Sequence, residues 1–309
     1  QREALQRIRR VNPDAAWLVH GREALRQVLS LFDPPWLMVD SATPLRAEEI
    51  ELISEERDLG YLNLSAEKLG EGVPLRLPGG LRTLVVSDWD PERNPLLPGD
   101  PASLEALTIM HASLRDLAAA APLERLKELH LLSCPKLENL GALSDTPSLR
   151  ALTLTDCKGL SDLSAVHDLH RLQWLGLPPA VSQPEFEALL HTHRDLRVLE
   201  LVRCERIRSL EPVAALKKLE SLVFLNGGLG AARLGDPETL RFVALSEAAF
   251  QEKGAARALQ EAHPDALIVR AEPFCLGSGW ILWLWPALIA GGLLSRRRRG
   301  NARPAASHA

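Results

Sequence analysis

The chain has 309 residues, 46% of them hydrophobic, which is enough to bury the core of one large domain or two ordinary ones. Aromatic residues make up only 5%, and the dominance of leucine favours a repetitive aliphatic core over a mixed globular one. The formal net charge is −4, and five arginines but no acidic residue follow Phe274. Residues 1–273 alone therefore have a net charge of −4 − 5 = −9, which argues against a nucleic-acid-binding role.

Residues 1–58 contain no clean repeat and are predicted to cap the N-terminal end of the fold with degenerate first coils. We expect a helix near residues 3–10, an apolar run over 15–19, a second helix near 22–31 and a strand over 36–39. Such a cap would cover apolar side chains that a repetitive core leaves open at its end.

A motif of the form L-x-x-L-x-L-x-x-C begins at Leu126 and recurs from Leu149 and Leu196. Weaker copies begin at Leu59, Leu81, Leu104, Leu172, Leu219 and Leu240. Consecutive copies start 21 to 24 residues apart, and leucine-rich sequence in random order would not hold that register over nine copies. The leucines of one copy point to one side and cannot be buried alone, so the pattern predicts stacked coils.

This motif and its spacing resemble the leucine-rich-repeat family, in its short class of about 22 residues per coil. The resemblance covers roughly residues 59–270 and implies an α/β solenoid, with short parallel strands on the concave face and 3₁₀ or helical segments on the convex side. We therefore predict a solenoid over 59–272, closed by a cap with a helix at 255–262 and a last strand at 266–270.

The ninth position of the three strongest copies is occupied by Cys134, Cys157 and Cys204. We expect buried structural thiols there, because a free cysteine packs as a small hydrophobic residue and this position lies in a buried turn. A disulfide or a metal site is the alternative, although no C-x-x-C pair supports zinc. No metal and no cofactor are predicted.

Residues 273–295 form an uncharged, apolar segment, and the nineteen residues 276–294 are about enough to cross a bilayer. Three tryptophans lie toward its N-terminal end, as an aromatic belt would. The basic tail 296–309 follows at once. The positive-inside rule then places this tail in the cytoplasm and the repeat domain outside it, in the periplasm or at the cell surface.

The order of a short motif, one hydrophobic span and an arginine cluster is similar to bacterial C-terminal sorting signals. The motif residues would be Cys275, Gly277 and Gly279, and the cluster would be Arg296, Arg297, Arg298 and Arg299. The resemblance implies cleavage by a processing protease or attachment of a lipid near Cys275. A plain membrane anchor through residues 274–294 is the alternative.

Alternation along each strand points the third, fifth and seventh positions of the motif to the concave face. The seventh positions form an apolar stripe made of Met110, Leu132, Pro178, Val202 and Leu225. Exposed apolar patches commonly mark interaction sites. We predict that a ligand binds this stripe together with His130, Thr155, Trp174, Val223 and Phe242.

The chain contains no G-x-S-x-G, no H-E-x-x-H and no phosphate-binding loop, and only His111, His130 and Asp156 could suggest acid–base chemistry. The sequence therefore predicts a non-enzymatic, membrane-anchored or surface-sorted recognition protein that binds a protein, a peptide or a glycan. The alternative is a tail-anchored intracellular scaffold that regulates a phosphatase or another enzyme. An enzyme built on a repeat scaffold is a third, weaker hypothesis.

Overall fold

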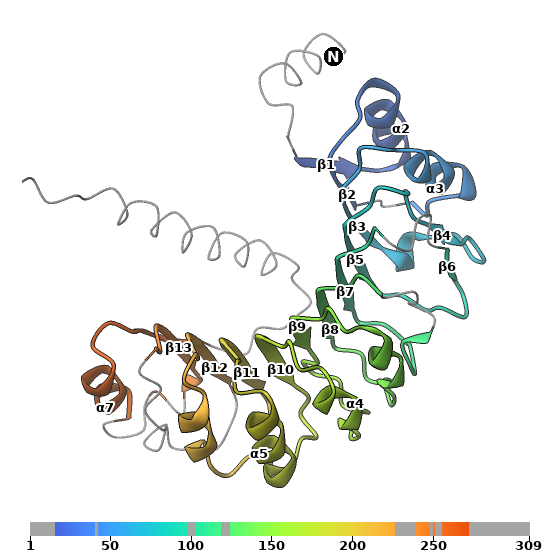
Figure 1. Cartoon of the computed structure of the whole chain (residues 1–309). Coiled ribbons are helices and arrows are strands. Elements are labelled where there is room, and N and C mark those ends of the chain that lie inside the picture. The colour runs from blue at the N-terminus through green and yellow to red at the C-terminus, as the bar shows by residue number, and fades with distance from the viewer. Residues whose placement is uncertain are drawn as a thin grey trace, which may run out of the picture. The chain divides into compact units, whose positions relative to one another are not determined.

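The computed structural model describes residues 16–40, 43–97, 103–118, 124–225, 239–247, 250 and 255–271. All of them lie in one compact unit, residues 1–273. Within this unit the chain winds in successive coils, each of which adds one strand to a common sheet (Figure 1).

The sheet has twelve strands, all parallel, and its strand order follows the order of the chain. The strands are β1 (Ala16–His20), β2 (Trp36–Asp40), β3 (Tyr61–Ser65), β5 (Thr83–Ser87), β7 (Ala106–Met110), β8 (Glu128–Leu132), β9 (Ala151–Thr153), β10 (Trp174–Leu177), β11 (Val198–Val202), β12 (Ser221–Leu225), β13 (Phe242–Leu245) and β14 (Leu267–Arg270). Two further strands, β4 (Leu75–Arg76) and β6 (Leu96–Leu97), pair with each other in a small parallel sheet.

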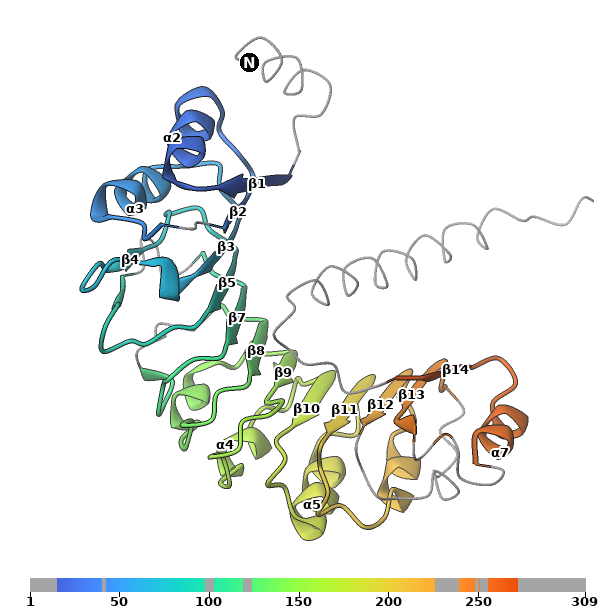
Figure 2. The same ribbon diagram turned by 180° about the vertical axis from the view of Figure 1, so that it is seen from behind.

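The core consists of leucine layers that the strand register stacks on one another. The fourth motif positions of consecutive coils are register partners and have no exposed surface: Leu129, Leu152, Leu175, Leu199 and Leu222. The strands line the inner, concave side of the arc, and the helical segments lie on its outer side (Figures 1 and 2). The predicted solenoid architecture is therefore confirmed.

Short helical segments return the chain along the convex side. They are α2 (Arg22–Leu31), α3 (Ala47–Ser54), η1 (Ala66–Lys68), η3 (Gly141–Asp145), α4 (Ser164–His167), α5 (Gln183–Thr192), η4 (Glu211–Ala215) and α7 (Ala255–Ala262). The α5 helix begins where the Ser182 side chain accepts a hydrogen bond from the Glu185 backbone N–H, and a proline occupies its first turn.

The predicted terminal elements agree closely with β1, α2, β2, α7 and β14. The structure adds that β1 pairs with β2 and β2 pairs with β3, so coils of the same sheet begin N-terminal to residue 59. The α3 helix was not predicted, since eight residues hold little periodic signal. Its buried Ile50 and Ile53 account for it, together with the hydrogen bond of 2.8 Å that the Arg46 backbone N–H donates to the Glu49 carboxylate. The helix expected near residues 3–10 lies outside the described residues.

Cys134, Cys157 and Cys204 are free thiols and fully buried, as predicted. Each sulfur faces a carbonyl of the preceding coil: Cys157 Sγ lies 3.5 Å from the Leu131 oxygen and Cys204 Sγ lies 3.7 Å from the Leu177 oxygen. Burial raises the pKa of Cys204 to about 12, so its thiol stays protonated. These cysteines join adjacent coils through weak hydrogen bonds.

The predicted membrane or sorting segment falls outside the described residues, together with Cys275, Gly277, Gly279 and the four arginines that follow it. Among the helices that the structure does describe, none combines the length and the apolar character that a bilayer crossing requires.

Candidate ligand-binding face

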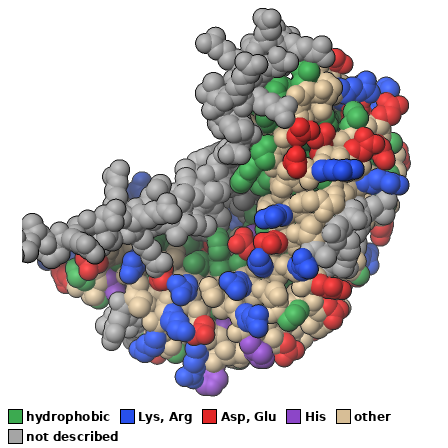
Figure 3. Space-filling model, turned by 45° about the horizontal axis from the view of Figure 1, so that its top comes forward, with side chains coloured by type: hydrophobic (Ala, Val, Ile, Leu, Met, Phe, Trp, Pro, Cys, Tyr) green, Lys and Arg blue, Asp and Glu red, His purple; other side chains and the backbone are tan. Residues whose placement is uncertain are grey.

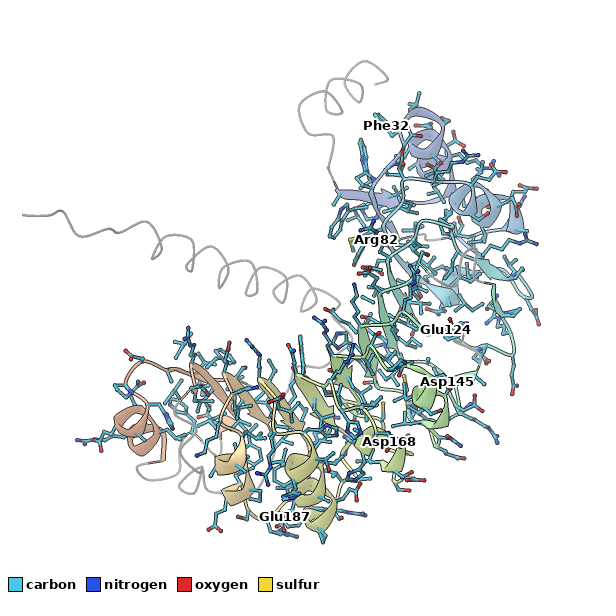
Figure 4. All side chains as sticks on the ribbon, viewed as in Figure 1. Phe32, Arg82, Glu124, Asp145, Asp168 and Glu187 are labelled. Carbon is cyan, nitrogen blue, oxygen red and sulfur yellow. The ribbon has the colours of Figure 1, made fainter. Side chains whose placement is uncertain are left out.

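Four neighbouring strands, β8 to β11, carry the chemically most varied part of the concave face, which we call the central face. Its middle row consists of the register partners His130, Thr153, Gly176 and Glu200, and Trp174 stands beside them at the third motif position. In Figure 4 the labelled Asp145, Asp168 and Glu187 mark the opposite, convex side, on or beside η3, α4 and α5.

His130 is held by its neighbours on the central face. Its Nδ1 atom lies 3.0 Å from the Thr153 hydroxyl, and its ring meets the Trp174 ring edge-on at a centroid distance of 5.2 Å. Glu128 lies near the other ring nitrogen, with Oε2 4.0 Å from Nε2. Burial lowers the pKa of His130 to about 4, so the imidazole is neutral near pH 7.

Glu200 is 8% exposed, and its carboxyl group leans over Gly176. A methyl group added at Gly176 would come within 3.2 Å of Glu200 Oε2 and within 2.9 Å of Thr153 Cγ2, so the glycine provides the room that both side chains occupy. Burial raises the pKa of Glu200 from 4.5 to about 7, and the Trp174 side chain opposes part of this rise.

The sequence prediction did not include Glu200 in the binding site. Glu200 occupies the fifth motif position, as His130 does, and its register partner is the only glycine in the row from His130 to Glu200. A large acidic residue beside a glycine on a concave face was the available signal, because the glycine leaves space for the acid to fold inward.

The predicted apolar stripe is not continuously exposed. Leu132 and Val202 are half-buried on the central face, whereas Met110, Pro178 and Leu225 are buried. The expectation of an open stripe was therefore wrong for these three residues. Neighbouring strands lie only about 5 Å apart, so large side chains in one column cover one another.

The structure groups the predicted binding residues unevenly. His130, Leu132, Thr155, Trp174, Pro178 and Val202 belong to the coils of β8 to β11, and Thr155 and Pro178 among them are buried. Val223 and Phe242 are half-buried and lie further along the sheet, on β12 and β13. Most of the predicted binding residues therefore come together at the central face.

A second network runs along the rim where the strands end. The eighth motif positions adopt a left-handed backbone with φ between 53° and 59° at Asp88, His111, Ser133, Asp156 and Arg203. Arg203 Nη1 lies 3.3 Å from Asp156 Oδ1, two coils away, across a coil that carries Pro179 at this position. Asp156 and His130 therefore take part in separate networks.

An aromatic patch at the N-terminal end of the concave face was also missed, because residues 1–58 were interpreted only as a cap. Trp36 is 49% exposed and stacks on Tyr61 at 4.9 Å, and Leu18 is 53% exposed. Figure 3 shows hydrophobic side chains gathered on the inner side of the arc and Lys and Arg side chains along one edge of it.

The side chains of the described residues form no cluster of three or more His, Cys, Asp or Glu that could hold a metal ion. The polar groups of the central face instead suit hydrogen bonding and ion pairing with a ligand, because they are few, fixed by neighbours and surrounded by apolar side chains.

Stacked coils, a continuous parallel sheet on the inner side and a core of leucine layers define a leucine-rich-repeat solenoid. No protein-family model matches the sequence, and no curated protein matches it. These comparisons leave the architecture and the central face as the basis for a functional proposal.

Solved structures of other repeat proteins are similar to the chain. Internalin C2 of Listeria monocytogenes is 18% identical with a TM-score of 0.41, over 64% of this chain and 83% of its own. Internalin F of the same organism is 14% identical with a TM-score of 0.43, over 84% and 78%. The leucine-rich-repeat protein LIC12759 of Leptospira interrogans is 16% identical with a TM-score of 0.37, over 79% and 86%.

The buried carboxyl of Glu200 predicts a specific dependence of stability on pH. Because its folded-state pKa of about 7 exceeds the ordinary value of 4.5, its contribution is fully present below pH 4.5 and is lost as the pH rises through 7. The Glu200→Gln variant cannot ionise at this position. In urea denaturation, its free energy of unfolding should therefore rise relative to that of the wild type by about 2 kcal/mol between about pH 5 and about pH 8.

Glu187→Gln on α5 serves as the control, because Glu187 is exposed on the convex side. An unchanged difference between Glu200→Gln and wild type across this pH range would show that the Glu200 carboxyl is not buried as described.

Proposed function

We propose that the chain is a non-enzymatic recognition protein that binds a protein or peptide on its concave face. The observation that supports this most is the central face itself, where half-buried Leu132, Trp174 and Val202 surround a small set of fixed polar groups. Apolar side chains left partly open beside oriented polar groups are typical of binding sites. Trp174 offers the large, rigid surface that interface anchors share.

The state of His130 favours binding over catalysis. A general acid or base works best with a pKa near the operating pH, whereas burial holds His130 neutral with a pKa of about 4. Its Nδ1 atom is also engaged by Thr153 at 3.0 Å. His130 therefore acts in this proposal as a packed hydrogen-bonding residue that positions Trp174.

Two charges introduced together on the central face should abolish partner capture. In Leu132→Glu/Val202→Glu, each carboxylate would have to lose its hydration when a ligand covers it. The free energy that this desolvation costs is larger than what the contact with the ligand returns. We expect the immobilised double variant to retain less than about a tenth of the partners that wild type retains, measured by quantitative mass spectrometry, with an unchanged far-UV circular dichroism spectrum.

Leu52→Glu is the matched control, since Leu52 is a partly exposed leucine of α3 on the convex side. Equal capture by the double variant and the wild type would overturn the concave face as the binding site.

We further propose that residues 274–294 anchor or sort the chain, with the repeat domain in the periplasm or at the cell surface and residues 296–309 in the cytoplasm. The support is the uncharged run followed by Arg296–Arg299, together with the similarity of this order to bacterial sorting signals. In this arrangement the concave face is available to partners outside the cytoplasm.

Protease added to intact cells should digest the repeat domain, because the proposed topology exposes it. If the tail is processed as a sorting signal, the intact mass of the recovered protein should correspond to a chain that ends near Cys275. A protected domain whose mass includes residues 296–309 would contradict surface sorting and would favour the tail-anchored intracellular scaffold.

A further inference from the structure

The carboxyl group of Glu200 faces the ligand side of the sheet without a cation. It is 8% exposed, and the Trp174 side chain is the neighbour that favours its ionised form. None of the ion pairs formed by the described residues includes Glu200. Three cations on the coils of β8 and β11 form ion pairs with other residues: Lys127 with Glu105 at 2.8 Å, Arg197 with Glu220 at 3.2 Å and Arg203 with Asp156 at 3.3 Å.

A carboxylate in this position is costly until a cation reaches it. Removing an ionised group from water is unfavourable unless it is paired and hydrogen-bonded, and a charge-assisted bond in such a site is stronger than a neutral one. The absence of a side chain at Gly176 lets the carboxyl group lie over the concave side of the sheet, where 8% of Glu200 stays exposed.

The residues beside Glu200 suit a cation as well. Trp174 is half-buried and presents an aromatic surface, and cations bind to the faces of indole rings. His130 is neutral and so does not repel a positive charge.

We propose that the central face recognises a basic side chain of an extended peptide, with the cation paired to Glu200 and its stem lying on Trp174. Arginine fits best, because its planar guanidinium both stacks on aromatic rings and donates two parallel hydrogen bonds to a carboxylate. This inference rests on the proposed function, since it requires that a peptide binds the concave face.

A positional-scanning library of hexapeptides, acetylated and amidated to remove terminal charges, tests the preference directly. The full 309-residue chain is immobilised, and each pool fixes one residue at one position. We expect wild type to select arginine, and lysine less strongly, at one position. Glu200→Gln should lose that selection, while Glu128→Gln, with the same change in net charge on the same face, should keep it.

A double-mutant cycle then measures the pairing. The best arginine peptide and its citrulline version, which has nearly the same shape but no charge, are titrated by fluorescence anisotropy. Wild type should bind the arginine peptide about ten-fold or more tightly than the citrulline peptide, and Glu200→Gln should bind the two equally. Glu200→Gln removes a buried charge, so the variant should fold. Its far-UV circular dichroism spectrum, compared with that of the wild type, checks this.

The outcomes separate the two proposals. Peptides bound without a basic preference, or with a preference that persists in Glu200→Gln, would overturn the role of Glu200 and leave concave-face binding intact. A wild-type chain that binds no peptide pool would overturn peptide binding itself, and this inference with it.

Discussion

The structure depends on one constraint, which is that no single coil can bury its own leucines. Leu129 is covered because Leu107 and Leu152 of the neighbouring coils stack against it, and the same arrangement repeats along the sheet. Parallel pairing in a constant register is the consequence. The register also places the fifth motif positions of successive coils about 5 Å apart, so it builds the central face and the core at the same time.

Burial controls the chemistry of the central face more than charge pairing does. It holds the imidazole of His130 neutral and raises the pKa of Glu200, although both groups lie on the side of the sheet that a ligand would meet. A glycine contributes to this arrangement, because the space over Gly176 lets the carboxyl fold inward. The Trp174 ring packs against His130, and the Trp174 side chain also lowers the pKa of Glu200, against the effect of burial.

The sequence predicted the repeat, its two faces, the terminal elements and the buried thiols, because a period of about 22 residues determines which positions share a layer. It did not predict how far each concave side chain is exposed. The exposure of Met110 or Leu225 depends on the side chains of neighbouring coils, and that of Glu200 depends on Gly176. The stacked pair Trp36–Tyr61 was missed because the coil of Trp36 lacks the leucine motif.

Hydroxyl-radical footprinting of the full chain, with and without a bound peptide, tests most directly whether the concave face is the binding surface. If it is, binding should reduce the oxidation of Leu132, Trp174 and Val202 and leave that of Leu52 on the convex side unchanged. Protection of Leu52, or protection confined to Leu18 and Trp36, with no change on the central face would contradict the account.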